Sequence, residues 1–313
     1  MTLRVADSAT KPYRGRFAPS PTGPLHFGSL VAAVGSFLHS RASGGEWLVR
    51  MEDIDPPREV PGAAADILRT LERFGMHWDG EVMYQSTRTD AYLAAIERLR
   101  AVGAAYPCGC SRREIADSGL RGIDGPIYPG TCREGAAPNK QARALRVRTD
   151  GVAVAFDDGW QGRIESALDR DVGDFVVRRA DGCIAYQLAV VVDDAAQGIT
   201  EVVRGADLLL STPRQLHLQR LLGAHTPAYA HLPVVMSAHG EKLSKQTGAL
   251  SIGDEPAVPL LRRVLSFLGQ REPEQEDAAD LETFWRFAIA TWDAQRVPRA
   301  IGVRYESPNT SWR

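Results

Sequence analysis

The sequence predicts an α/β fold, a doubly wound parallel sheet with an inserted cysteine-containing subdomain and a short helical C-terminal tail. Strand-like runs alternate with amphipathic helices over residues 1–105 and again over 172–250, which is typical of a parallel sheet covered by helices. Glycine and proline interrupt this alternation between 106 and 171 and indicate an insertion. Residues 251–313 favour helix. At roughly 150 residues per domain, a chain of 313 residues has room for about two domains.

The first half of the predicted sheet starts with a strand over 15–18 and continues through a Pro/Gly turn into a helix. That helix ends at Gly44-Gly45, and its apolar face consists of Leu30, Val31, Val34, Phe37 and Leu38. A second strand over 46–51 and helices over 63–74 and 91–102 follow. The last helix ends at Gly103, and its predicted buried face consists of Tyr92, Ala95, Ile96, Leu99 and Val102.

The second half begins with a hairpin signal, Asp181-Gly182, between strand-like runs over 175–177 and 184–186 that return the chain to the sheet. Further strand-like runs cover 199–205 and 231–236. Between them, Thr212-Pro213 predicts the start of a helix that runs to Gly223, because proline is favoured in the first helical turn.

Two remote motifs indicate a site for a polyphosphate. His26-Phe27-Gly28-Ser29 lies at the turn before the first helix, and Lys242-Leu243-Ser244-Lys245-Gln246 follows the strand-like run over 231–236. Free N–H groups at a helix start, together with the helix dipole and His26, favour a phosphate, and the lysines would close on it from the other side. Each motif alone also fits simple turn packing or a solvated loop. Together, and in this order, they favour ATP.

With these motifs the chain resembles class I aminoacyl-tRNA synthetases of the glutamyl type. It departs from their two signatures at Ser29, where histidine is usual, and at Gln246, where serine or arginine is usual. The resemblance implies a Rossmann-like catalytic domain that uses ATP with Mg²⁺. It also implies that His26 and Lys245 are catalytic and stabilise the charge that develops at the α-phosphorus. The ATP-binding residues it implies are Pro19, Ser20, Thr22, Gly23, His26, Gly28, Ser29, Lys242, Ser244 and Lys245.

A glutamate ligand needs a fork of donors for one carboxylate and an acceptor for its ammonium group, and arginine supplies such a fork. The resemblance implies that Arg204 pairs with the side-chain carboxylate and that Glu52 faces the ammonium. The implied glutamate-binding residues are Arg16, Phe17, Ala18, Pro19, Ser20, Glu52, Tyr186 and Arg204. Taken singly, Arg204 also fits a surface ion pair, Tyr186 a half-buried strand aromatic and Glu52 a turn cap.

The cysteines give a separate signal. Cys108 and Cys110 form a Cys-x-Cys turn, Cys132 follows, and Cys183 lies apart in an apolar run. Three thiolates and one further ligand make a closed structural zinc site, and no histidine lies near this segment. Tyr128 is the candidate fourth ligand, which the resemblance supports because one branch of the family carries Cys-x-Cys followed by Tyr-x-x-x-Cys. Free buried thiols remain the alternative.

Charge is segregated although the net charge is only −2. Between 112 and 148 bases outnumber acids, whereas 272–282 is acidic. The first segment is a candidate RNA-binding surface, although solvated charge runs are common. On the first interpretation, charge reversal at Arg143 and Arg146 impairs transfer to RNA and spares glutamate activation. The bases are Arg112, Arg113, Arg121, Arg133, Lys140, Arg143, Arg146 and Arg148.

Only 67 residues follow Gln246, which leaves no room for an anticodon-binding domain. The resemblance therefore points to the truncated branch of the family, which activates glutamate with ATP and transfers it to queuosine in the anticodon loop of tRNA(Asp). The alternative is a truncated enzyme that charges a tRNA 3′ end. An adenylyltransferase for a small metabolite and a non-catalytic RNA-binding module explain fewer of the residues. We expect a cytoplasmic monomer without a membrane segment, because no long apolar run occurs and cysteine is scarce.

Overall fold

The computed structural model describes residues 12–123, 125–135, 140–237, 240, 252–253 and 255–305. Its helices are α1 (Phe27–Ala42), α2 (Ala63–Arg73), α3 (Thr89–Ala101), α4 (Arg112–Asp117), α5 (Leu168–Asp171), α6 (Tyr186–Ala196), α7 (Thr212–Leu222), α8 (Ala257–Phe267) and α9 (Leu281–Ala290). Short 3₁₀ helices are η1 (Pro56–Arg58), η2 (Gln85–Arg88), η3 (Ala206–Ser211), η5 (Glu276–Ala278) and η6 (Ala294–Arg296). No helix among these described residues has both the length and the apolar character needed to cross a bilayer.

The strands are β1 (Arg14–Phe17), β2 (Glu46–Met51), β3 (Met83–Tyr84), β4 (Ala105–Cys108), β5 (Arg121–Gly122), β6 (Gly125–Pro126), β7 (Ala144–Val147), β8 (Ala153–Asp158), β9 (Gly162–Ala167), β10 (Phe175–Arg178), β11 (Glu201–Gly205), β12 (Ala228–Leu232), β13 (Val234–Met236) and β14 (Gly302–Arg304). Among the described strands, the parallel pairs are β1 with β2, β2 with β3, β11 with β12, and β13 with β14. The predicted parallel sheet is therefore confirmed.

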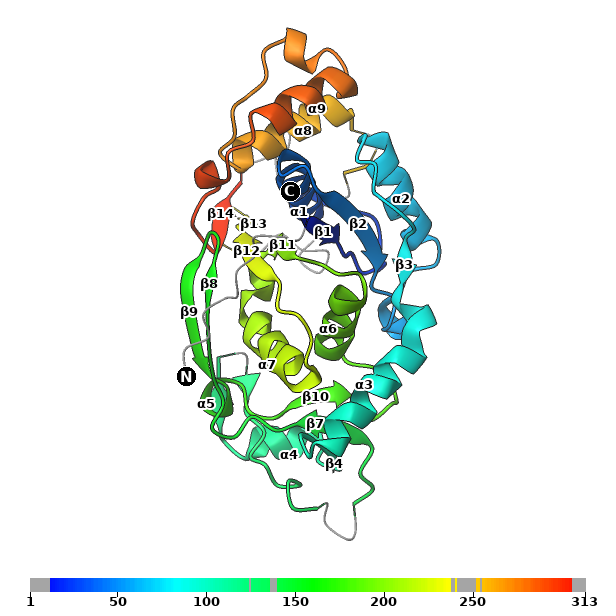
Figure 1. Cartoon of the computed structure of the whole chain (residues 1–313), viewed down its shortest axis with the longest axis vertical. Coiled ribbons are helices and arrows are strands. Elements are labelled where there is room, and N and C mark those ends of the chain that lie inside the picture. Colours follow the sequence, from blue (N-terminus) through cyan, green and yellow to red (C-terminus); the bar gives the residue numbers. More distant parts are fainter. Residues whose placement is uncertain are drawn as a thin grey trace.

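Two halves of the chain meet between β1 and β11, which lie side by side in the middle of Figure 1. The Thr200 N–H donates to the Arg14 carbonyl at 2.9 Å, and the Arg14 N–H donates to the Thr200 hydroxyl at 2.8 Å. This junction brings the carboxyl ends of β1, β2 and β11 to one edge, the place where ligands bind in open α/β sheets.

The main core lies between the parallel strands and helices α1, α2, α8 and α9 (Figure 1). Trp47 of β2 is fully buried, and Phe37 of α1 makes edge-to-face contacts with Trp47 and with Trp285 of α9. The tail is therefore part of the same core. It is helical as predicted, but it also contributes β14, which pairs with β13 and which the sequence did not indicate.

The segment between the halves contains an antiparallel sheet in the order β10-β7-β4, with α4 beside it at the lower end of Figure 1. The β8–β9 hairpin extends from this region toward β12, where the Gly159 N–H donates to the Tyr229 carbonyl at 2.9 Å. The insertion thus contacts the parallel strands.

Two local predictions were wrong. The run over 184–186 is not a strand, because Ile184 makes only one isolated bridge with Arg178 and the chain enters α6 at Tyr186. The strand before it, β10, belongs to the antiparallel sheet. Val102 follows α3 and is 64% exposed, whereas the other predicted residues of that helix face are buried. The helix over 212–223 is confirmed, with Gly223 in the left-handed conformation at its end.

Candidate active site

A cavity of about 770 Å³ lies at the carboxyl ends of β1 and β11 and at the start of α1. Every predicted ATP-binding or glutamate-binding residue that the structure describes lines this cavity, except Gly23. These lining residues are Arg16, Phe17, Ala18, Pro19, Ser20, Thr22, His26, Gly28, Ser29, Glu52, Tyr186 and Arg204. The predicted Lys242, Ser244 and Lys245 lie outside the described residues.

His26 is the N-cap of α1, and its ring is fixed by the helix it caps. Its Nδ1 accepts from the Ser29 N–H at 3.2 Å, and the Ser29 hydroxyl accepts from the His26 N–H at 2.9 Å. This reciprocal capping box satisfies two N–H groups that a helix start leaves without partners. Because Nδ1 is an acceptor, the neutral ring carries its proton on Nε2. Ser29, the residue that departs from the family signature, therefore has a structural role here.

Arg204, at the end of β11, is buried and has no carboxylate within ion-pair distance among the described residues. Its Nε donates to His231 Nε2 at 3.0 Å, and its Nη2 donates to Thr212 Oγ1 and Gln215 Oε1, both at 2.8 Å. Nη1 lacks such a short contact, and its hydrogen bond to the hydroxyl of Tyr186 is 3.4 Å long. Arg204 therefore offers one nitrogen to the cavity rather than a complete fork.

Arg16 and Glu52 belong to a buried ion cluster built on Asp194 of α6. Asp194 accepts from Arg16 Nε at 3.1 Å and Nη2 at 3.4 Å, and from Arg50 Nη1 at 2.7 Å. Arg50 also contacts Glu52 at 3.4 Å. Burial opposes ionisation of Asp194, but the two guanidinium groups outweigh it and hold the pKa of Asp194 below its usual value. The predicted fork of Arg16 is thus occupied by Asp194.

Glu52 lies at the cavity wall, and its contact with Arg50 does not offset the cost of burying its charge. Burial raises the pKa of the Glu52 carboxyl, in spite of the Arg50 and Arg16 charges nearby. A cationic group placed against Glu52 would oppose this effect, because an opposite charge stabilises the ionised form. Tyr186, at the start of α6, is next to Arg204, and burial raises the pKa of its hydroxyl. The phenol therefore remains a hydrogen-bond donor at neutral pH.

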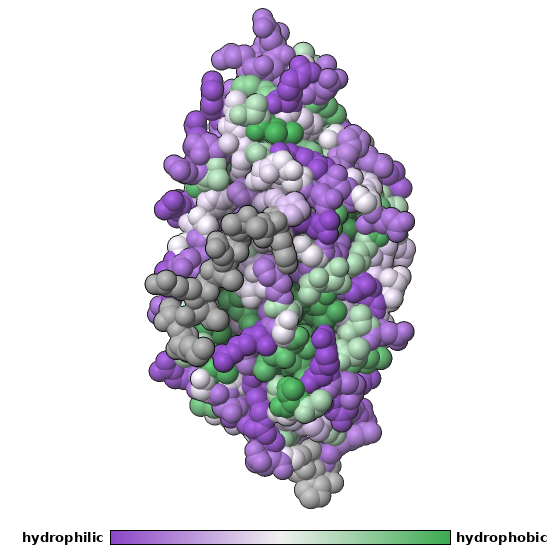
Figure 2. Space-filling model, in the orientation of Figure 1, coloured by the Kyte–Doolittle hydropathy of each residue, from purple (hydrophilic) through white to green (hydrophobic). Residues whose placement is uncertain are grey.

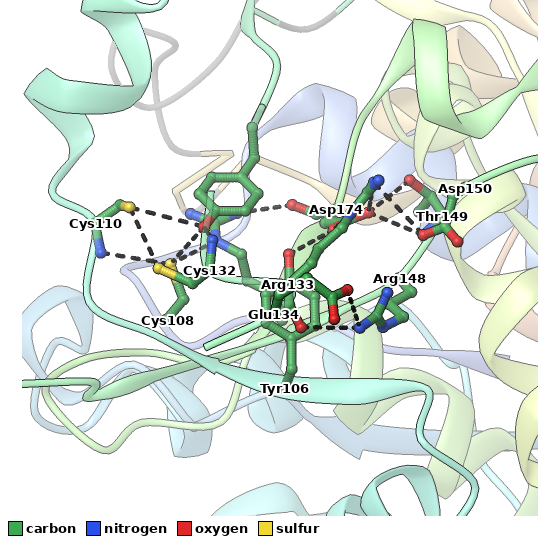
Figure 3. Close-up of polar contacts among 12 residues, drawn as sticks. Tyr106, Cys108, Cys110, Cys132, Arg133, Glu134, Arg148, Thr149, Asp150 and Asp174 are labelled. Carbon is green, nitrogen blue, oxygen red and sulfur yellow. Dashed lines mark hydrogen bonds and ion pairs between the residues drawn. The ribbon is translucent and has the colours of Figure 1, made fainter. Parts of the chain in front are cut away.

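The three predicted cysteine ligands come together in the insertion (Figure 3), and the Tyr128 hydroxyl lies beside them. The Sγ atoms of Cys108, Cys110 and Cys132 lie within 4.8 Å of one another. The Tyr128 hydroxyl is 3.4 Å from Cys108 Sγ and 3.7 Å from Cys110 Sγ, and the two sulfurs of Cys110 and Cys132 are 3.6 Å apart. A tetrahedral zinc with bonds of about 2.3 Å has ligand separations of roughly 3.8 Å. The donor set and its spacing fit zinc, whereas Cys183 lies outside the cluster.

Hydrogen bonds in this cluster favour the thiolate of Cys132, whereas burial raises the pKa of the Cys110 thiol. The Cys110 N–H and Arg146 Nε each donate to Cys108 Sγ at 3.4 Å. Burial opposes ionisation of Cys132, but hydrogen bonds from the Tyr128 hydroxyl and the Gly109 N–H hold its pKa below the usual value. Such second contacts orient metal ligands and tune their basicity.

Arg146 and Arg133 are structural rather than exposed, as Figure 3 illustrates for Arg133. Arg146 is buried, stacks over the Tyr128 ring at 4.1 Å and donates to the Asp174 carbonyl at 2.7 Å. Arg133 forms two bonds with the Asp174 carboxylate, at 2.7 and 2.8 Å. The expectation that Arg146 belongs to a basic surface that seats RNA was therefore wrong, because Arg146 is buried, while Arg143 is exposed.

The comparisons with known proteins agree with this geometry. The catalytic-domain model of tRNA synthetases class I (E and Q) matches residues 13–257. The chain belongs to the class I aminoacyl-tRNA synthetase family. Curated relatives include the glutamyl-Q tRNA(Asp) synthetase of Aromatoleum aromaticum, 58% identical over 95% of this chain and 94% of the relative. The protein of the same name from Dechloromonas aromatica is 60% identical over 92% and 96%.

Solved structures show the same fold. The glutamate tRNA ligase of Elizabethkingia meningosepticum, solved with its amino acid, has a TM-score of 0.77 and 24% identity, and the match covers 95% of this chain and 67% of that one. The glutamate-tRNA synthetase of Elizabethkingia anophelis gives the same TM-score. A class I synthetase-like α/β fold is therefore confirmed.

Sequence reasoning missed several residues around this synthetase site. Asp194 accepts from both Arg16 and Arg50, and His231 accepts from Arg204, although Asp194, Arg50 and His231 were not predicted. Adjacent aspartates inside an otherwise apolar run at 188–194 are a signal that could have indicated buried partners. Nothing in the sequence indicated Arg58, an exposed arginine that lines the cavity.

Proposed function

We propose that this protein activates L-glutamate with ATP and transfers it to queuosine in the anticodon loop of tRNA(Asp). The observation that carries the proposal is the near full-length match to relatives named glutamyl-Q tRNA(Asp) synthetase, combined with a cavity that contains Arg204 without a carboxylate partner in the described chain. A buried charge of this kind is costly unless a ligand or residue pairs with it. A dicarboxylic amino acid supplies the missing anion.

Glutamate fits the charges that line the cavity. Its side-chain carboxylate accepts from Arg204 Nη1 and from the Tyr186 hydroxyl, which are 3.4 Å apart. Its ammonium lies against Glu52, whose ionised form is disfavoured by burial. Glutamine lacks the negative charge that Arg204 requires, so this arrangement favours glutamate.

ATP occupies the part of the cavity next to α1, where the helix start and His26 face the phosphates. The α-carboxylate of glutamate attacks the α-phosphorus and pyrophosphate leaves. His26 and Lys245 stabilise the charge of this transition state, and Mg²⁺ bound with ATP would supply further positive charge to the phosphates. A hydroxyl of the queuosine ring then attacks the activated carbonyl, and AMP leaves.

The cysteine cluster would hold zinc in a structural role. Cys108, Cys110, Cys132 and Tyr128 supply a closed set of four ligands, and no position is left for a reactant. Bound zinc would join β4 to the turn after β6 and so order one end of the insertion. We also infer that the protein acts in the cytoplasm, where its proposed substrate tRNA(Asp) is found, and that it acts as a monomer.

An anticodon loop can present a modified base without the melting of a duplex. Figure 2 shows apolar side chains gathered over α6 and α7, on the face of the molecule that is seen in Figure 1. Exposed Arg112, Arg121 and Arg143 of the insertion are available to contact phosphates.

Glutamate-dependent exchange of pyrophosphate into ATP, measured without RNA, tests the activation step. The proposal predicts exchange with glutamate and little with glutamine, and absence of exchange with either amino acid overturns it. Arg143→Glu should retain exchange while it impairs transfer to tRNA. The matched control is Arg286→Glu on α9, an exposed arginine at the opposite end of the molecule (Figure 1), which should impair neither step.

A further inference from the structure

A buried chain of hydrogen bonds runs from the β8–β9 hairpin to the active site. Asp158 ends β8, and its Oδ1 accepts from the N–H groups of Trp160 at 3.1 Å, Gln161 at 3.0 Å and His231 at 3.0 Å. Its Oδ2 lies 2.5 Å from His231 Nδ1. Asp158 and His231 are fully enclosed, with side-chain exposures of 0%.

The contacts of the His231 ring define its tautomer. Asp158 is ionised, so its carboxylate accepts a hydrogen bond from His231 Nδ1. Nδ1 therefore carries the proton, and Nε2 presents a lone pair. That lone pair accepts from Arg204 Nε at 3.0 Å. Burial lowers the pKa of His231 to about 4, although the Asp158 hydrogen bond opposes the change. The ring is therefore neutral at physiological pH.

A neutral acceptor differs from a carboxylate in one respect that matters here. A carboxylate in direct contact would hold Arg204 equally well but would cancel most of its charge. The imidazole holds Nε, and Thr212 and Gln215 hold Nη2, without any such cancellation. The guanidinium stays in one orientation, and its charge remains available at Nη1 beside Tyr186.

We propose that Asp158 and His231 are positioning residues that fix Arg204 through a neutral imidazole and thereby set the preference for an anionic over an amide side chain. This inference rests on the proposed function, because it takes glutamate as the ligand of Arg204. The insertion contributes to amino-acid selection through Asp158, even though none of its described residues lines the cavity.

Three substitutions separate positioning from simple packing. In His231→Gln, the amide oxygen can replace Nε2 as the acceptor for Arg204, whereas His231→Leu removes the acceptor. In Asp158→Asn, the NH₂ group of the new amide can only donate. If this NH₂ group faces His231 Nδ1, the ring must take the Nε2–H tautomer, which points a proton toward Arg204 Nε. The opposite amide orientation places its NH₂ against three N–H donors. His231→Asn is not equivalent to His231→Gln, because its shorter amide reaches only the Nδ1 position.

The decisive experiment measures pyrophosphate exchange with glutamate and with glutamine for each variant, together with thermal midpoints. His231→Leu and Asp158→Asn should raise KM for glutamate at least about tenfold, because Arg204 loses an aligned partner, and should reduce glutamate selectivity more than kcat. His231→Gln should keep KM within about threefold of the wild type. His217→Leu, which removes another buried histidine outside the cavity, is the matched control and should lower stability without a change in KM.

Nitrogen NMR of ¹⁵N-histidine-labelled protein without substrates gives an independent readout. The inference predicts that His231 is the Nδ1–H tautomer in the wild type and the Nε2–H tautomer in Asp158→Asn. An Nε2–H tautomer in the wild type, or equal KM for His231→Leu and the wild type, overturns it. If the wild type shows no exchange with glutamate, the proposed function fails, while the tautomer still decides whether the hydrogen-bond chain exists.

Discussion

Replacing Asp194 with asparagine removes the negative charge that Arg16 and Arg50 share. Arg16 is 3% and Arg50 is 0% exposed, so neither can turn to water. Among the described residues, the carboxylate that remains in contact with this pair is Glu52, 3.4 Å from Arg50. Breaking a buried ion pair by removal of one partner costs about 3–5 kcal/mol. With an unfolding entropy of about 2.1 cal/mol/K per residue, a chain of 313 residues should then lose about 5–8 °C in its thermal midpoint.

Thermal unfolding followed by calorimetry or circular dichroism measures this effect, with Glu46→Gln as the matched control. Glu46 forms an exposed pair with Arg14, so its loss should cost less than about 1 kcal/mol. The pKa of Asp194 is lowered in the folded state, so its contribution is complete above a pH of about 4 and is lost as pH falls further. Equal midpoints for the two variants at pH 7 would refute the account of the buried cluster.

Other variants test the cavity, the metal and the packing. Tyr186→Phe should raise KM for glutamate by about 10- to 100-fold in the exchange assay, because the carboxylate loses a hydroxyl donor; an unchanged KM would exclude that contact. Cys132→Ser should abolish stoichiometric zinc in the purified protein and lower its thermal midpoint, while Cys183→Ser should retain the metal; equal zinc contents would contradict the assigned ligands. Gly45→Ala should cost about 1–3 kcal/mol in chemical denaturation, because a Cβ there would lie 2.5 Å from the Tyr13 carbonyl oxygen, and a neutral result would show that β1 and β2 can separate.

Local sequence signals predicted the elements that begin or end at glycine or proline. The helix after His26 and the helix over 212–223 are both present, since their apolar period and their caps agree. The run over 184–186 was predicted as a strand from the hairpin signal at Asp181-Gly182, but Tyr186 begins α6, in which residues 190–192 are all β-branched. Burial of that helix between other helices outweighs the local preference, and no short-range signal reveals it.

The candidate site was predictable in its residue types but not in its pairing. The sequence named Arg16 and Arg204 as donors, yet Asp194 lies 178 positions from Arg16 and His231 lies 27 positions from Arg204. Only the three-dimensional structure shows that each arginine has most of its donors occupied. Likewise, the spacing of the cysteines suggested a metal site, whereas the burial of Arg146 against Tyr128 depends on the fold of the insertion.

The location of transferred glutamate on RNA tests the central claim most directly. Purified protein would be incubated with ATP, radiolabelled glutamate and tRNA(Asp) with or without queuosine, and the product cleaved into anticodon and acceptor fragments. The account predicts label in the anticodon fragment only, and only when queuosine is present. Label on the 3′-terminal fragment, or equal labelling of tRNA that lacks queuosine, would contradict it.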